Sequence, residues 1–131
     1  MAGNVGIGTT TPTNKLTVAG NVTANGYYTT SDRNAKEHFE AVDANDVLQK
    51  ISAMPVTRWN FKTEPTVQHV GPMAQDFHAA FGLGQNDTTI ATVDEGGVAL
   101  AAIKALAKQN AELKAELDAL KARLDALTPQ R

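Results

Sequence analysis

The chain has 131 residues, with 12 Lys and Arg against 14 Asp and Glu, so its formal charge is -2. This balance provides no basic surface for a phosphate backbone, and we expect no nucleic acid partner. Cysteine is absent, which excludes disulfides, thiol catalysis and zinc sites built on cysteine. The longest mostly apolar stretch is interrupted by Lys104 and Lys108, so no membrane insertion is expected.

Residues 1–30 are rich in Gly, Asn and Thr, and Lys15 is their only charged side chain. Short alternations of apolar and polar residues, bounded by turn-forming residues, predict short β-strands. The apolar pairs are Val5 and Ile7, Leu16 and Val18, and Val22 and Ala24. Strands this short bury too little surface to stand alone, so this β stalk is expected to pair with copies of itself.

Residues 31–96 predict a small mixed α/β domain. Asp43 is the expected N-cap of a helix that runs to about Met54, where Pro55 stops it. Strands are predicted over residues 56–62, 67–70 and 89–93, and a second helix after Pro72, with Met73, Phe77, Ala80 and Phe81 on one side. A domain of this size is only marginally stable by itself.

Residues 97–131 are dominated by an expected long helix with apolar residues at alternating spacings of three and four. They form a heptad repeat with a positions Ile103, Asn110, Leu117 and Leu124, and d positions Leu106, Leu113, Leu120 and Leu127. We call these eight residues the seam. The helix is expected to start at Asp94 or at Gly96-Gly97 and to end at Pro129. The predicted fold class is therefore α+β: a β stalk, a small α/β domain and a long C-terminal helix.

The seam predicts a parallel coiled coil between copies of the chain. Leu at both a and d does not determine the number of strands, and Asn110 at an a position mainly sets the register. The alternative is a helix that packs its leucine stripe on its own domain. A strict repeat of 3.5 residues is narrower than a core-facing helix needs, which favours the coiled coil.

Conventional enzyme motifs for nucleotide, serine hydrolase or zinc protease chemistry are missing. The three histidines, His38, His69 and His78, do not have the helical spacing of metal ligands, so no metal is expected. Structural hydrogen bonding is the expected role of His69 and His78. No cofactor is implied.

The segment Ser31-Asp32-Arg33-Asn34-Ala35-Lys36 is the main candidate for chemistry. One interpretation is purely structural, with Ser31 or Asp32 opening a short helix or turn. The other is a Ser/Lys dyad, in which a neutral lysine accepts the proton of the serine hydroxyl. Desolvation or a nearby cation keeps a lysine neutral, and Arg33 is a candidate for that cation. On a regular helix Ser31 and Lys36 would point about 140° apart, so they can meet only through a turn or across chains.

These motifs, in this order, resemble the intramolecular chaperone, auto-processing domain at the C-terminus of phage tail spikes and tail fibres, the peptidase S74 type. The family pattern is Ser-Asp-x-x-x-Lys, then Gly-x-x-Ala-Gln, then Val-Asp and a long helix. Here it reads Ser31-Asp32 to Lys36, Gly71 to Ala74-Gln75, Val93-Asp94 and the helix over 97–127. Related domains occur in bacterial surface proteins and in a membrane-tethered eukaryotic transcription factor.

The resemblance implies a homotrimer that holds three chains together while an upstream β-structural fibre of the same polypeptide folds, and that then cuts itself off. The implied cut is the Thr30–Ser31 peptide bond, with Ser31 as nucleophile and Lys36 as base. Asp32 and Arg33 would have supporting roles, and Gly71, Ala74 and Gln75 a structural one. The implied location is a virion tail fibre or spike, or a bacterial cell surface.

Two rival functions remain at this point. A trimerisation cap of a fibre or adhesin that never cleaves would share the fold and differ only in chemistry. A coiled-coil DNA-binding module needs a basic region before the heptads. Residues 88–102 contain no Lys or Arg, so the DNA-binding interpretation is disfavoured.

Overall fold

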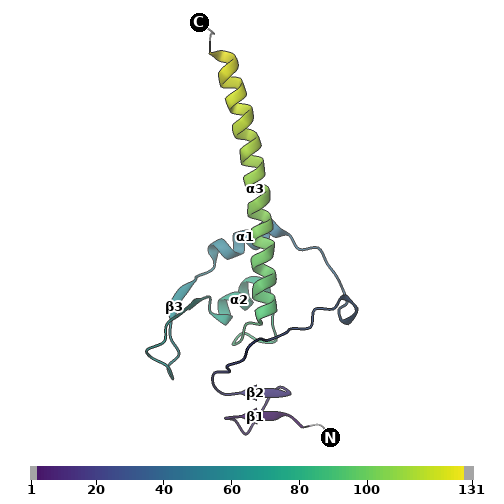
Figure 1. Ribbon diagram of the computed structural model, residues 1–131, viewed down its shortest axis with the longest axis vertical. Coiled ribbons are helices and arrows are strands. Elements are labelled where there is room, and N and C mark those ends of the chain that lie inside the picture. The colour runs from purple at the N-terminus through teal and green to yellow at the C-terminus, as the bar shows by residue number, and fades with distance from the viewer. Residues whose placement is uncertain (1–2, 129–131) are drawn as a thin grey trace. The chain divides into compact units, whose positions relative to one another are not determined.

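A computed structural model describes residues 3–128 of the chain. The chain divides into two compact units, Met1–Glu37 and His38–Arg131. Among the described residues, the fold is α+β, with four short strands, one 3-10 turn and three α-helices, of which the last is long (Figure 1). The predicted fold class is confirmed at this level.

The first unit contains two of the three predicted strands. Strands β1 (Val5–Ile7) and β2 (Leu16–Val18) pair in parallel. The connection between them turns tightly, and a Cβ at Gly6 would collide with the carbonyl oxygen of Thr9. The apolar side chains of Val5, Ile7 and Leu16 stay more than half exposed. This exposure agrees with the expectation that the stalk needs further chains to cover it.

The strand predicted around Val22 and Ala24 is wrong, because residues 21–30 form neither strand nor helix. A stretch with two alternating apolar residues, set between Gly20-Asn21 and Asn25-Gly26, becomes a strand only when a neighbouring strand supplies hydrogen bonds.

The second unit begins with helix α1 (Ala44–Ala53), in agreement with the prediction. Asp43 caps it, since its Oδ1 accepts hydrogen bonds from the backbone N–H groups of Asn45 at 2.9 Å and Asp46 at 3.2 Å. The helix ends before Met54, which has an extended backbone as expected for a residue before Pro55.

The cap makes a measurable prediction. Replacing Asp43 by Ala is expected to lower the free energy of unfolding by about 1 kcal/mol, because two helix N–H groups lose their acceptor. Replacing it by Asn, which retains an acceptor oxygen, is expected to cost much less. Urea unfolding at one protein concentration measures both, and equal losses for the two variants would contradict the capping role.

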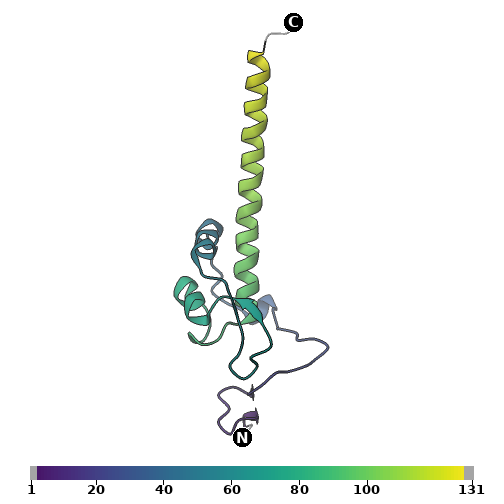
Figure 2. The same ribbon diagram turned by 90° about the vertical axis from the view of Figure 1, so that its left-hand side faces the viewer.

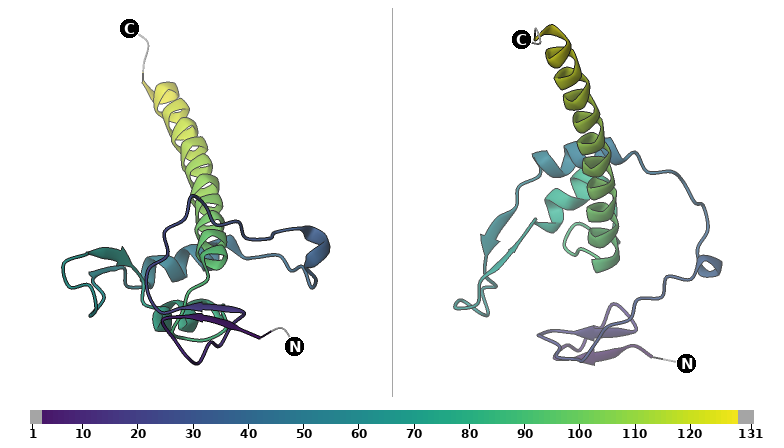
Figure 3. Two further views of the ribbon diagram at one scale, coloured as in Figure 1. Left: turned by 60° about the horizontal axis from the view of Figure 1, so that its bottom comes forward. Right: turned by 45° about the horizontal axis from the view of Figure 1, so that its top comes forward.

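Strands β3 (Thr57–Trp59) and β4 (His69–Gly71) form an antiparallel hairpin that projects away from the long helix (Figure 3). Both strands are shorter than predicted. Helix α2 (Ala74–Phe81) follows two residues after Pro72, buries Phe77, and ends at Gly82, whose φ of 65° is the left-handed conformation common after helices.

Helix α3 (Thr92–Leu127) starts earlier than expected. The strand predicted over residues 89–93 is wrong, because residues 89–91 have no regular structure and the helix begins at Thr92. The β-branched residues Thr92 and Val93 favoured a strand. Two factors favour a helix instead: Asp94 and Glu95 in its first turn suit the positive end of the helix dipole, and Val98 is buried one turn later. The helix passes through Gly96 and Gly97 without a break. Pro129, the predicted end, lies outside the described residues.

The core of the second unit is small and lies where α1 packs against the first turns of α3. Its buried residues are Val47, Phe77, Val98 and Ala102, and Ala105 is buried nearby. The rest of α3 extends beyond the other elements of this unit, as Figures 1 and 2 show. Helix α3 therefore has a base, up to Ala105, that contacts its own domain, and a distal part that does not.

Candidate active site

The side chains of Ser31 and Lys36 meet through a short turn. Residues Arg33–Ala35 form a 3-10 turn, and Lys36 follows it with an extended backbone. This geometry brings Lys36 Nζ to 2.7 Å from Ser31 Oγ, with the amine donating a hydrogen bond to the hydroxyl oxygen. The spacing of Ser31 and Lys36 leaves two arrangements open, a turn within one chain or a contact between chains. The turn within one chain is sufficient to pair the two side chains.

Asp32 holds the turn together. Its Oδ1 accepts from the backbone N–H of Asn34 at 3.0 Å and from Asn34 Nδ2 at 3.1 Å. The Asp32 and Arg33 carbonyl oxygens accept from the Ala35 and Lys36 N–H groups. The capping interpretation therefore applies to Asp32, while Ser31 is left to pair with Lys36. Arg33 lies within the turn between them.

Both members of the pair are exposed in the single chain, as are all residues from 31 to 40. A lysine accepts the proton of a serine hydroxyl only as the neutral amine, and exclusion of water favours that form. The two side chains are thus close enough to act as nucleophile and base. In the single chain, however, water surrounds them, and the chemistry of a Ser/Lys dyad requires that water is excluded.

His38, two residues after Lys36, has a φ of 54°, the left-handed region that side chains other than glycine rarely adopt. It is the first residue of the second unit. His adopts this conformation more often than most residues other than glycine, but a single residue of this kind cannot be located from the sequence.

The second predicted motif lies in the second unit, at the hairpin and α2. Gly71 ends β4, and a Cβ added to it would lie 3.8 Å from Trp59 Nε1. Ala74 and Gln75 start α2. Ala74 and Gln75 line a pocket of about 550 Å³ together with Trp59. The motif residues therefore lie at the junction between the hairpin and α2, and their structural role stays a prediction.

An aromatic cluster beside this motif was not anticipated. The Trp59 and His69 rings stack with centroids 4.8 Å apart, and Phe61 contacts both edge-on. Trp59 Nε1 and His69 Nε2 are buried and lack a hydrogen-bond partner among the described residues. The structural hydrogen bond expected for His69 is thus not made by Nε2, whereas His78 makes its own, through Nδ1, with the Leu83 carbonyl oxygen at 2.8 Å.

The seam does not pack on its own domain. Its seven Ile and Leu side chains are between 51% and 81% exposed, and Asn110 is exposed as well. The contacts of α3 with its own domain come from another side of the helix, through Val98, Ala102 and Ala105. The alternative interpretation of the leucine stripe is therefore wrong for this chain.

The family comparison agrees with the residues of the site. A peptidase S74 family model, described as chaperone of endosialidase, matches residues 31–82. The match begins at Ser31 and ends at Gly82, so it includes the Ser31–Lys36 turn and the Gly71–Gln75 motif. Among residues 3–128, no helix is long and apolar enough to cross a membrane.

Proposed function

We propose that this chain is an intramolecular chaperone that trimerises, assists the folding of an upstream β-structural fibre, and then releases itself by cutting the Thr30–Ser31 peptide bond. The proposal is supported by the match of residues 31–82 to the peptidase S74 family model, described as chaperone of endosialidase. The observation that carries the proposal is the contact of 2.7 Å between Ser31 Oγ and Lys36 Nζ. The fibre would be a phage tail fibre or spike, or a bacterial surface protein.

The proposed reaction is local to one dipeptide. Ser31 Oγ attacks the carbonyl carbon of Thr30, and its proton moves to neutral Lys36 Nζ. The C–N bond then breaks as Lys36 returns the proton to the Ser31 nitrogen, which leaves Thr30 joined to Ser31 Oγ as an ester. Water hydrolyses the ester, giving a Thr30 carboxylate and a Ser31 with a free amino group. Nucleophile and carbonyl belong to adjacent residues, so no separate substrate has to be bound.

Assembly supplies what the single chain lacks. Lys36 is exposed in one chain, and packing of neighbouring chains around the turn would exclude water and favour the neutral amine. Cleavage would then wait until the three chains are correctly packed. In this way the cut would report that folding has succeeded.

The trimer also explains the chaperone role. Three β-chains that form one stalk must first bring their ends into register, which has a large entropic cost. A coiled coil through the exposed seam of α3 would raise the local concentration of the chains and align them. Removal of the helper afterwards would leave a stalk that cannot easily reverse its assembly, which is kinetic stability.

Light scattering on the Ser31→Ala variant tests the trimer without interference from cleavage. At micromolar concentration we expect a mass three times the 13.9 kDa of one chain. A mass equal to one chain would overturn the trimer.

A non-cleaving trimerisation cap is the second candidate, and the exposure of Lys36 in one chain is the observation that favours it. The cap has the same seam and the same expected mass. The two candidates therefore differ only in whether the Thr30–Ser31 bond is cut.

Asp32 is expected to control the rate of the proposed cleavage through the shape of the turn. Replacing Asp32 by Ala removes the acceptor that holds Asn34, so Ser31 and Lys36 should spend less time in contact and cleavage should slow by about 10-fold to 100-fold. Asp32→Asn retains an acceptor oxygen and should lose less. The uncleaved fraction followed by mass spectrometry gives both rates, and an unchanged rate for Asp32→Ala would exclude the positioning role.

A further inference from the structure

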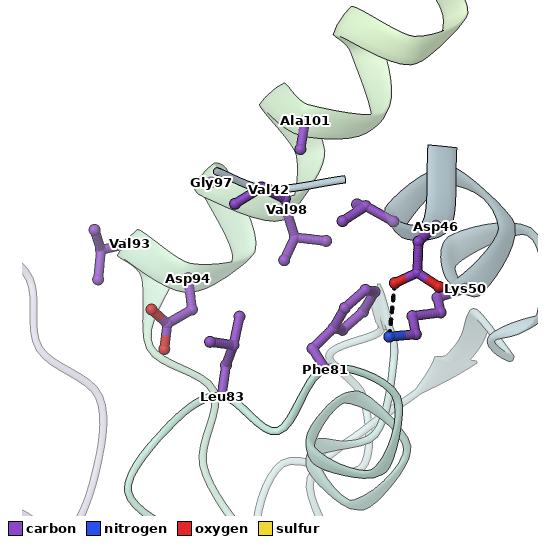
Figure 4. A pocket seen from close by; sticks show the side chains of 11 residues that line it. Val42, Asp46, Lys50, Phe81, Leu83, Val93, Asp94, Gly97, Val98 and Ala101 are labelled. Atoms are coloured by element: carbon purple, nitrogen blue, oxygen red, sulfur yellow. Dashed lines mark ion pairs between the residues drawn. The ribbon is translucent and has the colours of Figure 1, made fainter. Parts of the chain in front are cut away.

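The base of α3 carries two exposed apolar side chains beside the seam. Val93 is 49% exposed and Leu100 is 66% exposed. In the heptad frame set by the seam, both occupy e positions. Leu100 lies on the side of α3 away from Ala102, through which the helix packs on its own domain. Val93 instead lines a cavity of its own chain, together with Leu83 and Val98 (Figure 4).

The e positions change character along the helix. From the base outward they are Val93, Leu100, Ala107, Lys114 and Lys121. Charged residues are usual at e positions, where they border water. The e positions are large and apolar only over the part of α3 that also packs on its own domain, which ends at Ala105. The base of the helix therefore offers an apolar surface where an ordinary coiled coil has none.

Coiled-coil geometry says what would face this surface. In a parallel coiled coil, the e side of one helix faces the g side of its neighbour. The g position at the base is Ala102, which is only 6% exposed because it belongs to the core that α1 and α3 form. Leu100 of one copy would therefore approach helix α1 of the next copy, because α1 covers the g side of α3 there.

The two flanks of α1 differ in what they contact. Asp46 and Lys50, joined by an ion pair of 2.8 Å, border a cavity of about 400 Å³ together with Phe81 at the end of α2 (Figure 4). Ala53 lies in a second pocket lined by residues of α2. This flank is thus occupied by α2 of the same chain. The opposite flank carries Leu48, which packs against the core but stays partly exposed, and Ser52, which is exposed.

We propose that Leu100 of one copy docks on the Leu48 and Ser52 flank of α1 in the next copy. This inference rests on the proposed parallel trimer, and it assigns the second contact that the trimer makes beyond its seam. Each copy gives its e side to one neighbour and its α1 flank to the other, so three such contacts close a ring. The exposed side chain of Leu100 is then covered in the assembly.

Cross-linking tests this contact directly, because the chain has no cysteine of its own. In the Ser31→Ala background, Leu100→Cys is combined with Ser52→Cys and treated with a short bismaleimide. The expected product on a denaturing gel is a covalent trimer of three 13.9 kDa chains, since each copy is bonded to both neighbours. Leu100→Cys with Ala53→Cys is the matched control, as Ala53 is the next residue on α1 but lies on the flank occupied by α2.

The outcomes separate this contact from the trimer itself. A covalent trimer from the Ser52 pair and at least about tenfold less from the Ala53 pair supports the docking. Equal yields from the two pairs, or no covalent trimer although light scattering shows three chains, would overturn it and leave the proposed function intact. A mass of one chain for the variant without added cysteines would instead show that the trimer is wrong, and the docking with it.

A measurement of melting temperature tests the contact independently of the geometry that cross-linking requires. Leu100→Ser should lower the melting temperature of the trimer clearly more than Ala122→Ser, which changes an outward-facing f position of the distal helix. Equal melting temperatures for these two variants would also contradict the docking.

Discussion

Replacing Lys36 by methionine is expected to slow cleavage of the Thr30–Ser31 bond by a factor on the order of 10² to 10⁴, the usual contribution of a general base. Methionine has nearly the length and shape of lysine but no amine, so the Ser31 hydroxyl loses the group 2.7 Å away that would accept its proton. Intact mass at successive times after expression measures the rate.

Two further variants control for charge and for the loss of any lysine. Lys36→Arg should be nearly as slow as Lys36→Met, because a guanidinium stays protonated and cannot act as a base. Lys15→Met removes the other lysine of the first unit and should cleave like the wild type. Cleavage by Lys36→Met at the wild-type rate would remove Lys36 from the mechanism.

The second large effect is expected at the seam. Leu117→Asp combined with Leu120→Asp should convert the trimer to single chains. In a trimer, each substitution replaces the three leucines of one layer by three carboxylates. Each lost leucine alone is worth about 2 to 5 kcal/mol when buried. Light scattering should then give the mass of one chain, 13.9 kDa.

The same double variant should also fail to cleave if the dyad depends on assembly. Ala115→Asp with Ala122→Asp is the matched control, since it adds the same charges at f positions that point away from the seam. That variant should stay trimeric and cleave normally. A monomeric Leu117→Asp, Leu120→Asp protein that cleaves at the wild-type rate would show that cleavage does not wait for assembly.

The parts of the fold that were predictable carry their signals within a few residues. Helix α1 is bounded by Asp43, whose side chain caps it, and by Pro55, which stops it. The residues that determine both ends of the helix therefore lie next to it in the sequence. The start of α3 was misjudged because Thr92 and Val93 favour strands by themselves. Burial of Val98 against α1 favours the helix over the strand. This contact joins Val98 to Val47, about fifty positions away in the sequence, so local propensity does not predict it.

The candidate site was predictable in composition but not in geometry. Ser31 and Lys36 were identified by residue type and by order of motifs, yet five positions on a helix would keep them apart. The 3-10 turn and the extended backbone of Lys36 bring them together. Trp59 Nε1 and His69 Nε2 are buried without a hydrogen-bond partner among residues 3–128, and the sequence carries no signal for this, because their burial depends on the pairing of two strands.

The central claim is that the chain cuts itself with Ser31, and denaturing intact mass of the wild type beside Ser31→Ala tests it most directly. The wild type should separate into fragments of roughly 3 and 11 kDa, in proportion to the 30 and 101 residues on either side of the cut, while Ser31→Ala stays whole. If both proteins stay whole after prolonged incubation as confirmed trimers, the cleavage claim is contradicted and the chain acts as a trimerisation cap.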